Sequence, residues 1–203
     1  FVMEFNGTRA AYLAGKVADK ATNLPIYDAH ISLKPLNGPN KIQSNSDLKG
    51  NYKMGSGDNG THEITVSKAG YQIYRKNIDL FTDSLITLDI LMEELPKSSI
   101  KITLNDAQTG NVIPDAEVQI WTDQLSYSGK TDSNGLCLID QIYHGQYVLL
   151  CGKWSYLHKG DSNLVISGYH EKNYTLSIGF EDQFVLHHDW KIISDDSIVS
   201  WQY

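Results

Sequence analysis

Apolar and polar residues alternate with a period of two along much of this chain. Residues 29–33 (AHISL) and 116–120 (AEVQI) place an apolar side chain at every second position, and residues 62–66 (HEITV) and 146–150 (QYVLL) continue the pattern. Alternation of this kind is typical of β-strands with one buried face, and no stretch shows a convincing period of 3.6 residues. The pattern therefore predicts strands rather than helices.

Clusters of Gly, Asn, Asp and Pro separate these stretches. Examples are residues 37–40 (NGPN), 55–60 (GSGDNG) and 132–135 (DSNG). They favour tight turns, because Gly adopts positive φ and Asn and Asp bond to nearby backbone. Short strands at a spacing of about 8–12 residues, with turns between them, indicate an all-β sandwich.

The strand pattern occurs twice. An offset of 87 positions places Asp28 on Asp115, and the apolar residues that follow them coincide without a gap. Further along, residues 46–52 (SDLKGNY) lie over residues 131–137 (TDSNGLC) at an offset of 85 positions. A difference of two residues fits a change in loop length, which surface loops tolerate. We therefore expect two copies of one β-unit.

The repeated Asp-Ala pair has a structural explanation. Asp28 and Asp115 each stand just before a predicted strand, where an Asp side chain can fix the turn by bonding to the backbone. Ala29 and Ala116 follow, and a small side chain suits a strand that packs closely on the opposite sheet. These four residues are predicted to be turn residues rather than a duplicated catalytic site.

The boundary between the copies falls near residues 93–99 (EELPKSS), because Pro96 interrupts strand pairing. The tail after residue 181 departs from the repeat and contains further strand-like sequence. The sequence predicts an N-terminal extension (1–11), a first sandwich (12–94), a second sandwich (98–180) and a tail (181–203) that is either an extra strand or the start of a further β-domain.

Composition and charge narrow the function classes. The chain has 203 residues, of which 41% are hydrophobic and 20% charged, values typical of globular proteins. A net charge of −7 repels phosphate backbones and argues against nucleic acid as a partner. No apolar stretch approaches the ~20 residues that a membrane-spanning helix needs. Phe1 is not a natural start, so we expect a mature piece of a longer protein.

Residues 13–93 carry the segments LAGKVADKATNLPIYDAHISL, SNSDLKGNY, GTHEITVSKAGYQ and LITLDILME. In this order they resemble the carboxypeptidase regulatory-like domain, with His62 in place of a usual aromatic residue. The resemblance implies a seven-stranded transthyretin-like (prealbumin-like) sandwich in each copy. The second copy, residues 98–180, is looser: Cys137 stands where Tyr is usual, and Trp154 begins the step that is usually Ala-Gly-Tyr.

A second resemblance concerns the chain's end. Residues 153–157 (KWSYL) and 180–196 (FEDQFVLHHDWKIISDD) are similar to a segment of secreted bacterial peptidases. There such repeats follow the catalytic domain. This resemblance implies a secreted or cell-surface location and a peptidase parent, whose catalytic domain would be the partner of this region.

Catalytic motifs are missing from the sequence. No His-x-x-Glu or His-Glu-x-x-His zinc motif occurs, nor a Gly-x-Ser-x-Gly elbow or a Gly-rich phosphate loop. Residues 187–189 (HHD) carry metal-ligating types, but neighbouring strand residues point to opposite faces. Residues 58–63 and 131–135 lack the full oxygen set of a calcium loop. We therefore expect no cofactor and no catalytic site in this chain.

Cys137 and Cys151 are the two cysteines. If residues 135–151 form one hairpin centred on His144, the two side chains face each other, close enough for a bridge. An exported protein permits a disulfide. Two buried free thiols are the alternative, and the sequence leaves both open.

Exposed aromatic residues of the second copy raise a binding hypothesis. Trp121, Trp154 and Tyr156 could form a platform, because aromatic rings stack on sugar faces and dominate recognition surfaces. Core and interface packing is the simpler interpretation. The main hypothesis is a non-catalytic accessory region of a secreted bacterial peptidase, acting as spacer, stabiliser or docking surface. The alternative is a module that binds carbohydrate or protein at the cell surface.

Overall fold

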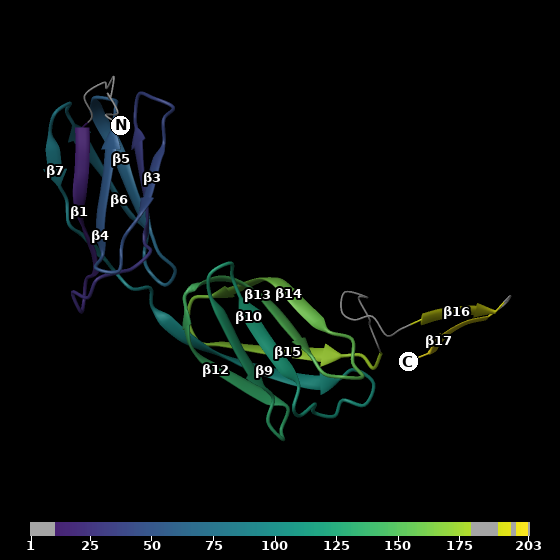
Figure 1. The fold of residues 1–203 in the computed structure, drawn as a ribbon. Helices are drawn as coiled ribbons and strands as arrows, with labels where there is room; N and C mark the ends of the chain where they lie inside the picture. The colour runs from purple at the N-terminus through teal and green to yellow at the C-terminus, as the bar shows by residue number, and fades with distance from the viewer. Residues whose placement is uncertain (1–10, 180–190, 196–197, 203) are drawn as a thin grey trace.

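The computed structural model describes residues 11–179, 191–195 and 198–202. Every regular element in these ranges is a β-strand, which confirms the all-β prediction. Nearly all of the predicted N-terminal extension lies outside the described residues. Of the predicted tail, only the hairpin of β16 (Lys191–Asp195) and β17 (Ile198–Gln202) is described. Figure 1 shows two sandwich-like units before it, joined by the short segment between β8 and β9.

The first unit contains two four-stranded sheets. One has the order β4-β1-β7, with β8 also paired to β1, and the other has the order β3-β2-β5-β6. β7 and β8 run parallel to successive parts of β1 and together act as one interrupted strand. The strands are β1 (Ala11–Asp19), β2 (His30–Pro35), β3 (Ile42–Asn45), β4 (Asn51–Ser56), β5 (Gly60–Ser67), β6 (Tyr74–Leu80), β7 (Leu85–Thr87) and β8 (Ile90–Met92).

The second unit repeats this arrangement with seven strands. Its sheets have the orders β12-β9-β15 and β11-β10-β13-β14. β15 runs parallel to β9, as β7 and β8 do to β1. The strands are β9 (Lys97–Asp106), β10 (Glu117–Trp121), β11 (Ser126–Lys130), β12 (Leu136–Tyr143), β13 (Gly145–Gly152), β14 (Lys159–Ile166) and β15 (His170–Leu176).

Each unit has its own hydrophobic core. The alternating residues of the facing sheets point inward and bury their apolar side chains completely. Full burial of one such aliphatic side chain stabilises the fold by roughly 1.5–3 kcal/mol. The largest fully buried side chains are Leu13, Ile31, Leu33, Ile64, Leu80, Ile90 and Met92 in the first unit, and Ile100, Ile102, Leu104, Ile113 and Ile120 in the second.

His62 is fully buried in the first core and has both ring nitrogens bonded. Its Nδ1 lies 2.9 Å from the carbonyl oxygen of Gly60, and its Nε2 lies 2.9 Å from the hydroxyl of Ser56. Because a carbonyl oxygen only accepts, Nδ1 donates to Gly60, and Nε2 shares a hydrogen bond with the Ser56 hydroxyl. His62 thus fills an aromatic-sized position while its polar atoms remain satisfied.

The predicted hairpin across the two cysteines is wrong. β12 pairs with β9 and places Cys137 opposite Ile102, whereas β13 pairs with β10 and places Cys151 opposite Val118. The chain passes from one sheet to the other at His144, so the two strands belong to different sheets. Both cysteines are buried free thiols. The structure therefore corresponds to the second alternative, two small buried side chains.

The segment between the units is short and tied to both of them. The Leu95 amide donates to the Gly70 carbonyl at 2.8 Å, and the His144 amide donates to the Pro96 carbonyl at 2.8 Å. The hydroxyl of Ser98 also lies 2.7 Å from the Nε2 of His144. The linker backbone is thus held by one residue of the first unit and by one of the second.

Candidate functional site

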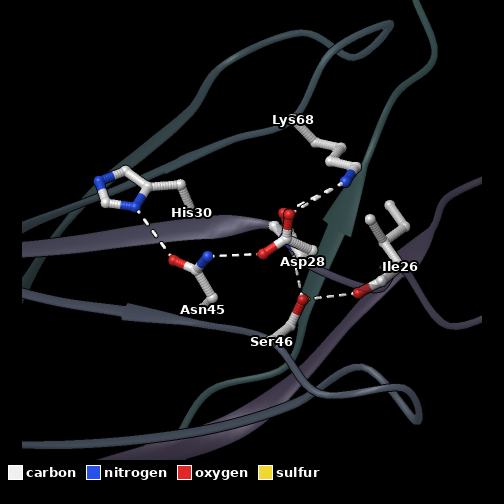
Figure 2. A network of polar contacts seen from close by, with 7 residues as sticks. Ile26, Asp28, His30, Asn45, Ser46 and Lys68 are labelled. Carbon is white, nitrogen blue, oxygen red and sulfur yellow. Dashed lines mark hydrogen bonds and ion pairs between the residues drawn. The ribbon is translucent and has the colours of Figure 1, made fainter. Parts of the chain in front are cut away.

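The joint that leads into β2 is built around a hydroxyl group. Asp28 has a φ of 54°, a left-handed conformation that Asp tolerates better than most residues. Its amide donates to the Ser46 carbonyl at 3.0 Å. The Ser46 hydroxyl accepts the Ala29 amide at 2.9 Å and donates to the Ile26 carbonyl at 2.6 Å (Figure 2). This hydroxyl therefore fastens both sides of the turn.

The joint that leads into β10 has the same geometry. Asp115 has a φ of 55°, and its amide donates to the Thr131 carbonyl at 2.9 Å. The Thr131 hydroxyl accepts the Ala116 amide at 2.9 Å and donates to the Ile113 carbonyl at 2.7 Å. The offset found in the sequence thus corresponds to equivalent hydrogen bonds in the two units.

The expected side-chain-to-backbone bond comes from a different residue than the sequence indicated. Ser46 and Thr131 supply it, and the aspartate contributes its left-handed backbone. The carboxylate of Asp28 points outward, accepts a hydrogen bond from Asn45 Nδ2 at 2.6 Å and lies 3.9 Å from Lys68 Nζ. The aspartate side chain is therefore available for interactions on the surface of the unit.

In the first unit the polar side chains of this surface bond one another. The Asn45 Oδ1 lies 3.2 Å from Nδ1 of His30, and Nε2 of His30 lies 3.3 Å from the Gln43 amide nitrogen. Lys68 donates to the Asp28 carbonyl at 3.2 Å. Figure 2 shows the part of this chain of polar contacts that joins His30, Asn45, Asp28 and Lys68. A depression of about 630 Å³ lies over them, and Gln124 and Leu125 of the second unit also line it.

The equivalent surface of the second unit is open. No side chain in the described ranges pairs with the Asp115 carboxylate. Lys130 stands where the first unit has Asn45, but it pairs with Glu117 at 3.2 Å. Lys153, the counterpart of Lys68, donates to the Pro114 carbonyl at 2.7 Å. A depression of about 560 Å³ covers this place; it is lined by Asp115, Glu117, Gln119, Leu150, Gly152, Lys153, Trp154 and His158.

Two of the three candidate platform residues share one face of the second unit. Trp154 follows β13, lines the depression and is 84% exposed. Trp121 ends β10 opposite Val148, and alternation places its side chain on the outer face of the same sheet. Tyr156 has a different position: its ring packs against the second core and its hydroxyl donates to Asp106 at 2.9 Å. Tyr156 is thus a packing residue.

The aspartates of the neighbouring turns serve the backbone. Asp132 Oδ1 accepts the amides of Asn134 and Leu136 at 2.8 and 2.9 Å, and these bonds lower the pKa of Asp132. No group of three or more His, Cys, Asp or Glu residues that could hold a metal occurs within the described ranges. The candidate ligands of residues 187–189 lie outside the described residues.

Residues 13–102 match the family model of the CarboxypepD_reg-like domain. The matched segment covers nearly all of the first unit and the first part of β9. The match confirms the resemblance found in residues 13–93. It ends within β9, so the looser resemblance of the second unit stays a prediction. No curated protein matches the chain.

Similar solved structures include a Streptococcal ancillary pilin, with 12% sequence identity and a TM-score of 0.52 over 85% of this chain and 63% of that chain. The Bacillus anthracis TIE protein has 18% identity and a TM-score of 0.41, over 84% of this chain and 34% of that one. This chain therefore spans about a third of the TIE protein chain and less than two thirds of the pilin chain. At these identities the likeness to the pilin shows a shared β-fold.

Proposed function

We propose that this chain is a non-catalytic accessory module of a larger, secreted or cell-surface bacterial protein. Its two units, residues 12–94 and 98–180, are two seven-stranded transthyretin-like sandwiches in tandem, with β7 and β8 counted as one interrupted strand. They act as a spacer that presents a neighbouring domain at a defined orientation. The catalytic domain of a peptidase is the proposed neighbour. The observation that carries the proposal is the side-chain clamp between the two units.

The clamp is centred on Tyr143 at the end of β12. Its hydroxyl donates to the Glu94 carboxylate at 2.5 Å, across the boundary between the units. Lys97 lies 2.9 Å from the same carboxylate and 4.6 Å from the centre of the Tyr143 ring. The ring also covers Gly70, where a Cβ atom would lie 2.8 Å from Tyr143 Cε2. The linker is thus held by an ion pair, a cation–π contact and close packing.

A clamped linker supports a spacer rather than a flexible tether. Pro96 has a restricted φ, and the backbone of its neighbours is bonded to both units. Flexible linkers are rich in Gly and Ser and lack such bonds. The likeness to a Streptococcal ancillary pilin supports a proposed surface location. No helix among the described residues is long and apolar enough to span a membrane.

The orientation of the two units tests the spacer function. Small-angle scattering and residual dipolar couplings on the purified chain should fit one dominant arrangement. Tyr143→Ala should broaden it while both units stay folded, because the variant removes the clamp and leaves the linker. Tyr169→Ala is the matched control, since Tyr169 is an exposed tyrosine whose hydroxyl bonds Glu171 within the second unit. A wild-type chain with freely reorienting units would contradict the proposal.

The accessory role has a separate test. The purified chain should cleave neither proteins nor a peptide library, with or without added zinc. Hydrolysis that a chelator abolishes would show a catalytic site in the chain itself. The sequence of the full parent protein tests the neighbour: a parent without a hydrolase domain would remove the peptidase part and leave the spacer function in place.

A second candidate function is binding to carbohydrate or protein at the cell surface. The observation that favours it is the 84% exposed Trp154 beside the Asp115 carboxylate, with which no side chain of the described residues pairs. Surface binding and spacing do not exclude each other, because the clamp and this surface involve different residues.

A further inference from the structure

We infer that the depression beside Trp154 in the second unit is a binding groove for a neutral oligosaccharide. The inference rests on the proposed surface-binding function and assigns it a site and a ligand class. The Trp154 groove is defined by Asp115, Glu117, Gln119, Leu150 and Trp154, with Gly152, Lys153 and His158 at its margin.

The first argument is the comparison of the two equivalent surfaces. The turns at Asp28 and Asp115 have the same backbone conformation and the same hydrogen bonds from a buried hydroxyl. The differences between their surface side chains are therefore not needed to form the fold. In the first unit the Asp28 carboxylate is bound by Asn45, and a small Ala69 follows Lys68. In the second unit no side chain in the part of the chain that the structure describes pairs with the Asp115 carboxylate, and an exposed Trp154 follows Lys153. The second copy exposes the groups that the first copy satisfies.

The second argument is that Trp154 is exposed on a fixed turn. The Tyr156 amide donates to the Lys153 carbonyl at 3.0 Å, and Ser155 between them has a φ of 74°. The Gly179 amide donates to the Ser155 carbonyl at 3.0 Å, and the hydroxyl of Tyr156 is anchored on Asp106. An anchored turn holds the indole ring outward, so a ligand can cover it at little cost in conformational entropy.

The third argument is the chemistry of the groove floor. Glu117 and Gln119 lie on the same outer face of β10, about 6.6 Å apart by strand geometry. Leu150 faces Gln119 across the strand pair, and Gly152 leaves room opposite Glu117. A pyranose ring has one apolar C–H face, which stacks on an indole, and equatorial hydroxyls, which bond carboxylates and amides. A row of planar polar side chains beside one exposed Trp suits such rings.

The charges of the groove favour a neutral ligand. The Lys130 ammonium is paired with Glu117, and the Lys153 ammonium, which donates to the Pro114 carbonyl, keeps its positive charge. Because the charges of Lys153 and Asp115 offset each other, the aspartate, glutamate and lysine side chains give the groove no net charge that would attract an acidic or a basic ligand. A cationic peptide is the competing occupant. Cation recognition favours a cage of several rings, whereas Trp121 lies at the other end of the sheet face, opposite Val148.

Isotope-edited NMR titrations with neutral oligosaccharides of glucose, xylose, mannose and N-acetylglucosamine test the inference. At least one of them should shift the amide signals of the groove residues. Trp154→Ala should weaken binding at least tenfold, because aromatic anchors dominate such sites. The variant should fold, since the side chain it removes is 84% exposed. Heparin and tetra-lysine serve as anionic and cationic probes, and neither should bind as tightly as the neutral sugar.

Asp115→Asn separates a sugar from a cation. The amide oxygen still accepts hydrogen bonds from hydroxyls, so sugar binding should stay within about threefold, whereas binding of a cation would be lost. Asn also tolerates the left-handed backbone. Asp28→Asn in the first unit is the matched control and should leave binding unchanged.

Three outcomes would overturn the inference: no neutral sugar shifts the groove residues, Trp154→Ala binds as the wild type does, or tetra-lysine binds tighter than every sugar and loses affinity in Asp115→Asn. None of them alters the measured orientation of the two units, so failure here and failure of the spacer proposal are distinguishable.

Discussion

The hydroxyl oxygen of Thr131 lies 2.9 Å from the amide nitrogen of Ala116, and Ser46 has the same relationship to Ala29 in the first unit. In both places the same hydroxyl also bonds a carbonyl, that of Ile113 or Ile26. Ser46 and Thr131 are buried polar residues in otherwise apolar surroundings. The two joints are thus hydrogen-bonded centres within the sandwiches, and they can be tested by single substitutions.

Thr131→Val should destabilise the second unit. Valine has nearly the same shape but no hydroxyl, so the Ala116 amide and the Ile113 carbonyl lose their partner inside the fold. The expected loss in the free energy of unfolding is about 1–3 kcal/mol, the cost of leaving buried polar groups unpaired. Urea denaturation followed by tryptophan fluorescence measures it. Thr131→Ser keeps the hydroxyl and should cost clearly less; equal losses for both variants would assign the effect to packing.

Gly70 and Ser155 occupy equivalent turns of the two units, and substituting them should change the stability of the chain in opposite directions. Ser155 has a φ of 74°, which costs a residue with a Cβ about 1–2 kcal/mol. Ser155→Gly removes this strain but gives the unfolded chain more freedom, so we expect between no change and about 1 kcal/mol of added stability.

Gly70→Ala should destabilise the chain by at least about 1 kcal/mol, the scale of a non-glycine residue at positive φ. Its φ is 83°, and the new Cβ would also meet the Tyr143 ring. Thermal unfolding of both variants, together with scattering data for Gly70→Ala, measures these effects. The argument from positive φ fails if the two variants change the melting temperature in the same direction.

Local turn chemistry made much of the fold predictable from the sequence. The all-β class and the equivalence of Asp28 with Asp115 follow from residues close together in the chain, because turns and alternation depend on neighbours. Strand pairing depends on residues far apart in the chain, and the pairing of β12 and β13 could not be predicted from the sequence. Nothing in residues 135–151 shows that the chain changes sheets at His144, so the sequence left open whether Cys137 and Cys151 face each other.

The candidate site was only partly predictable for the same reason. Trp154 was found as the place where the copies differ, but Tyr156 two positions later packs inward. Asp115 lacks a side-chain partner among the described residues because Lys130, across the sheet, pairs with Glu117 instead. An offset of 85 places Lys130 over Asn45. A comparison of Asn45 with Lys130 could therefore have indicated from the sequence that Asp115 lacks the partner that Asp28 has.

Native Cys137 and Cys151 should react slowly with thiol reagents. Burial raises the pKa of both thiols, that of Cys151 to about 11, so little thiolate exists near pH 8. Titration with a chromogenic disulfide should count two thiols per chain in denaturant without reductant, and close to none in the folded chain over minutes. A count of zero in denaturant would show that the two cysteines are oxidised.

Acid should destabilise the chain through its turn aspartates. The amides of Thr109 and Gln108 donate to Asp106 at 2.8 Å each and lower the pKa of its carboxyl below the ordinary 3.8. Asp19 has the equivalent bonds and the same direction of shift. A depressed pKa in the folded state contributes stability that is complete above 3.8 and is lost as the pH falls through the lower, folded value. The contribution of these two aspartates to stability should therefore be constant between pH 7 and 5 and fall below about pH 4.

Asp106→Asn tests whether these bonds cause the acid response. The Asn oxygen still accepts the two amides, so the turn persists, but it cannot be protonated in this range. The variant should be less stable than the wild type at pH 7 and should lose less stability between pH 4 and 2.5. Urea denaturation at several pH values measures the slope. Asp140→Asn, an exposed aspartate on β12, is the control and should keep the wild-type slope. An unchanged slope in Asp106→Asn would mean that other carboxylates cause the acid response.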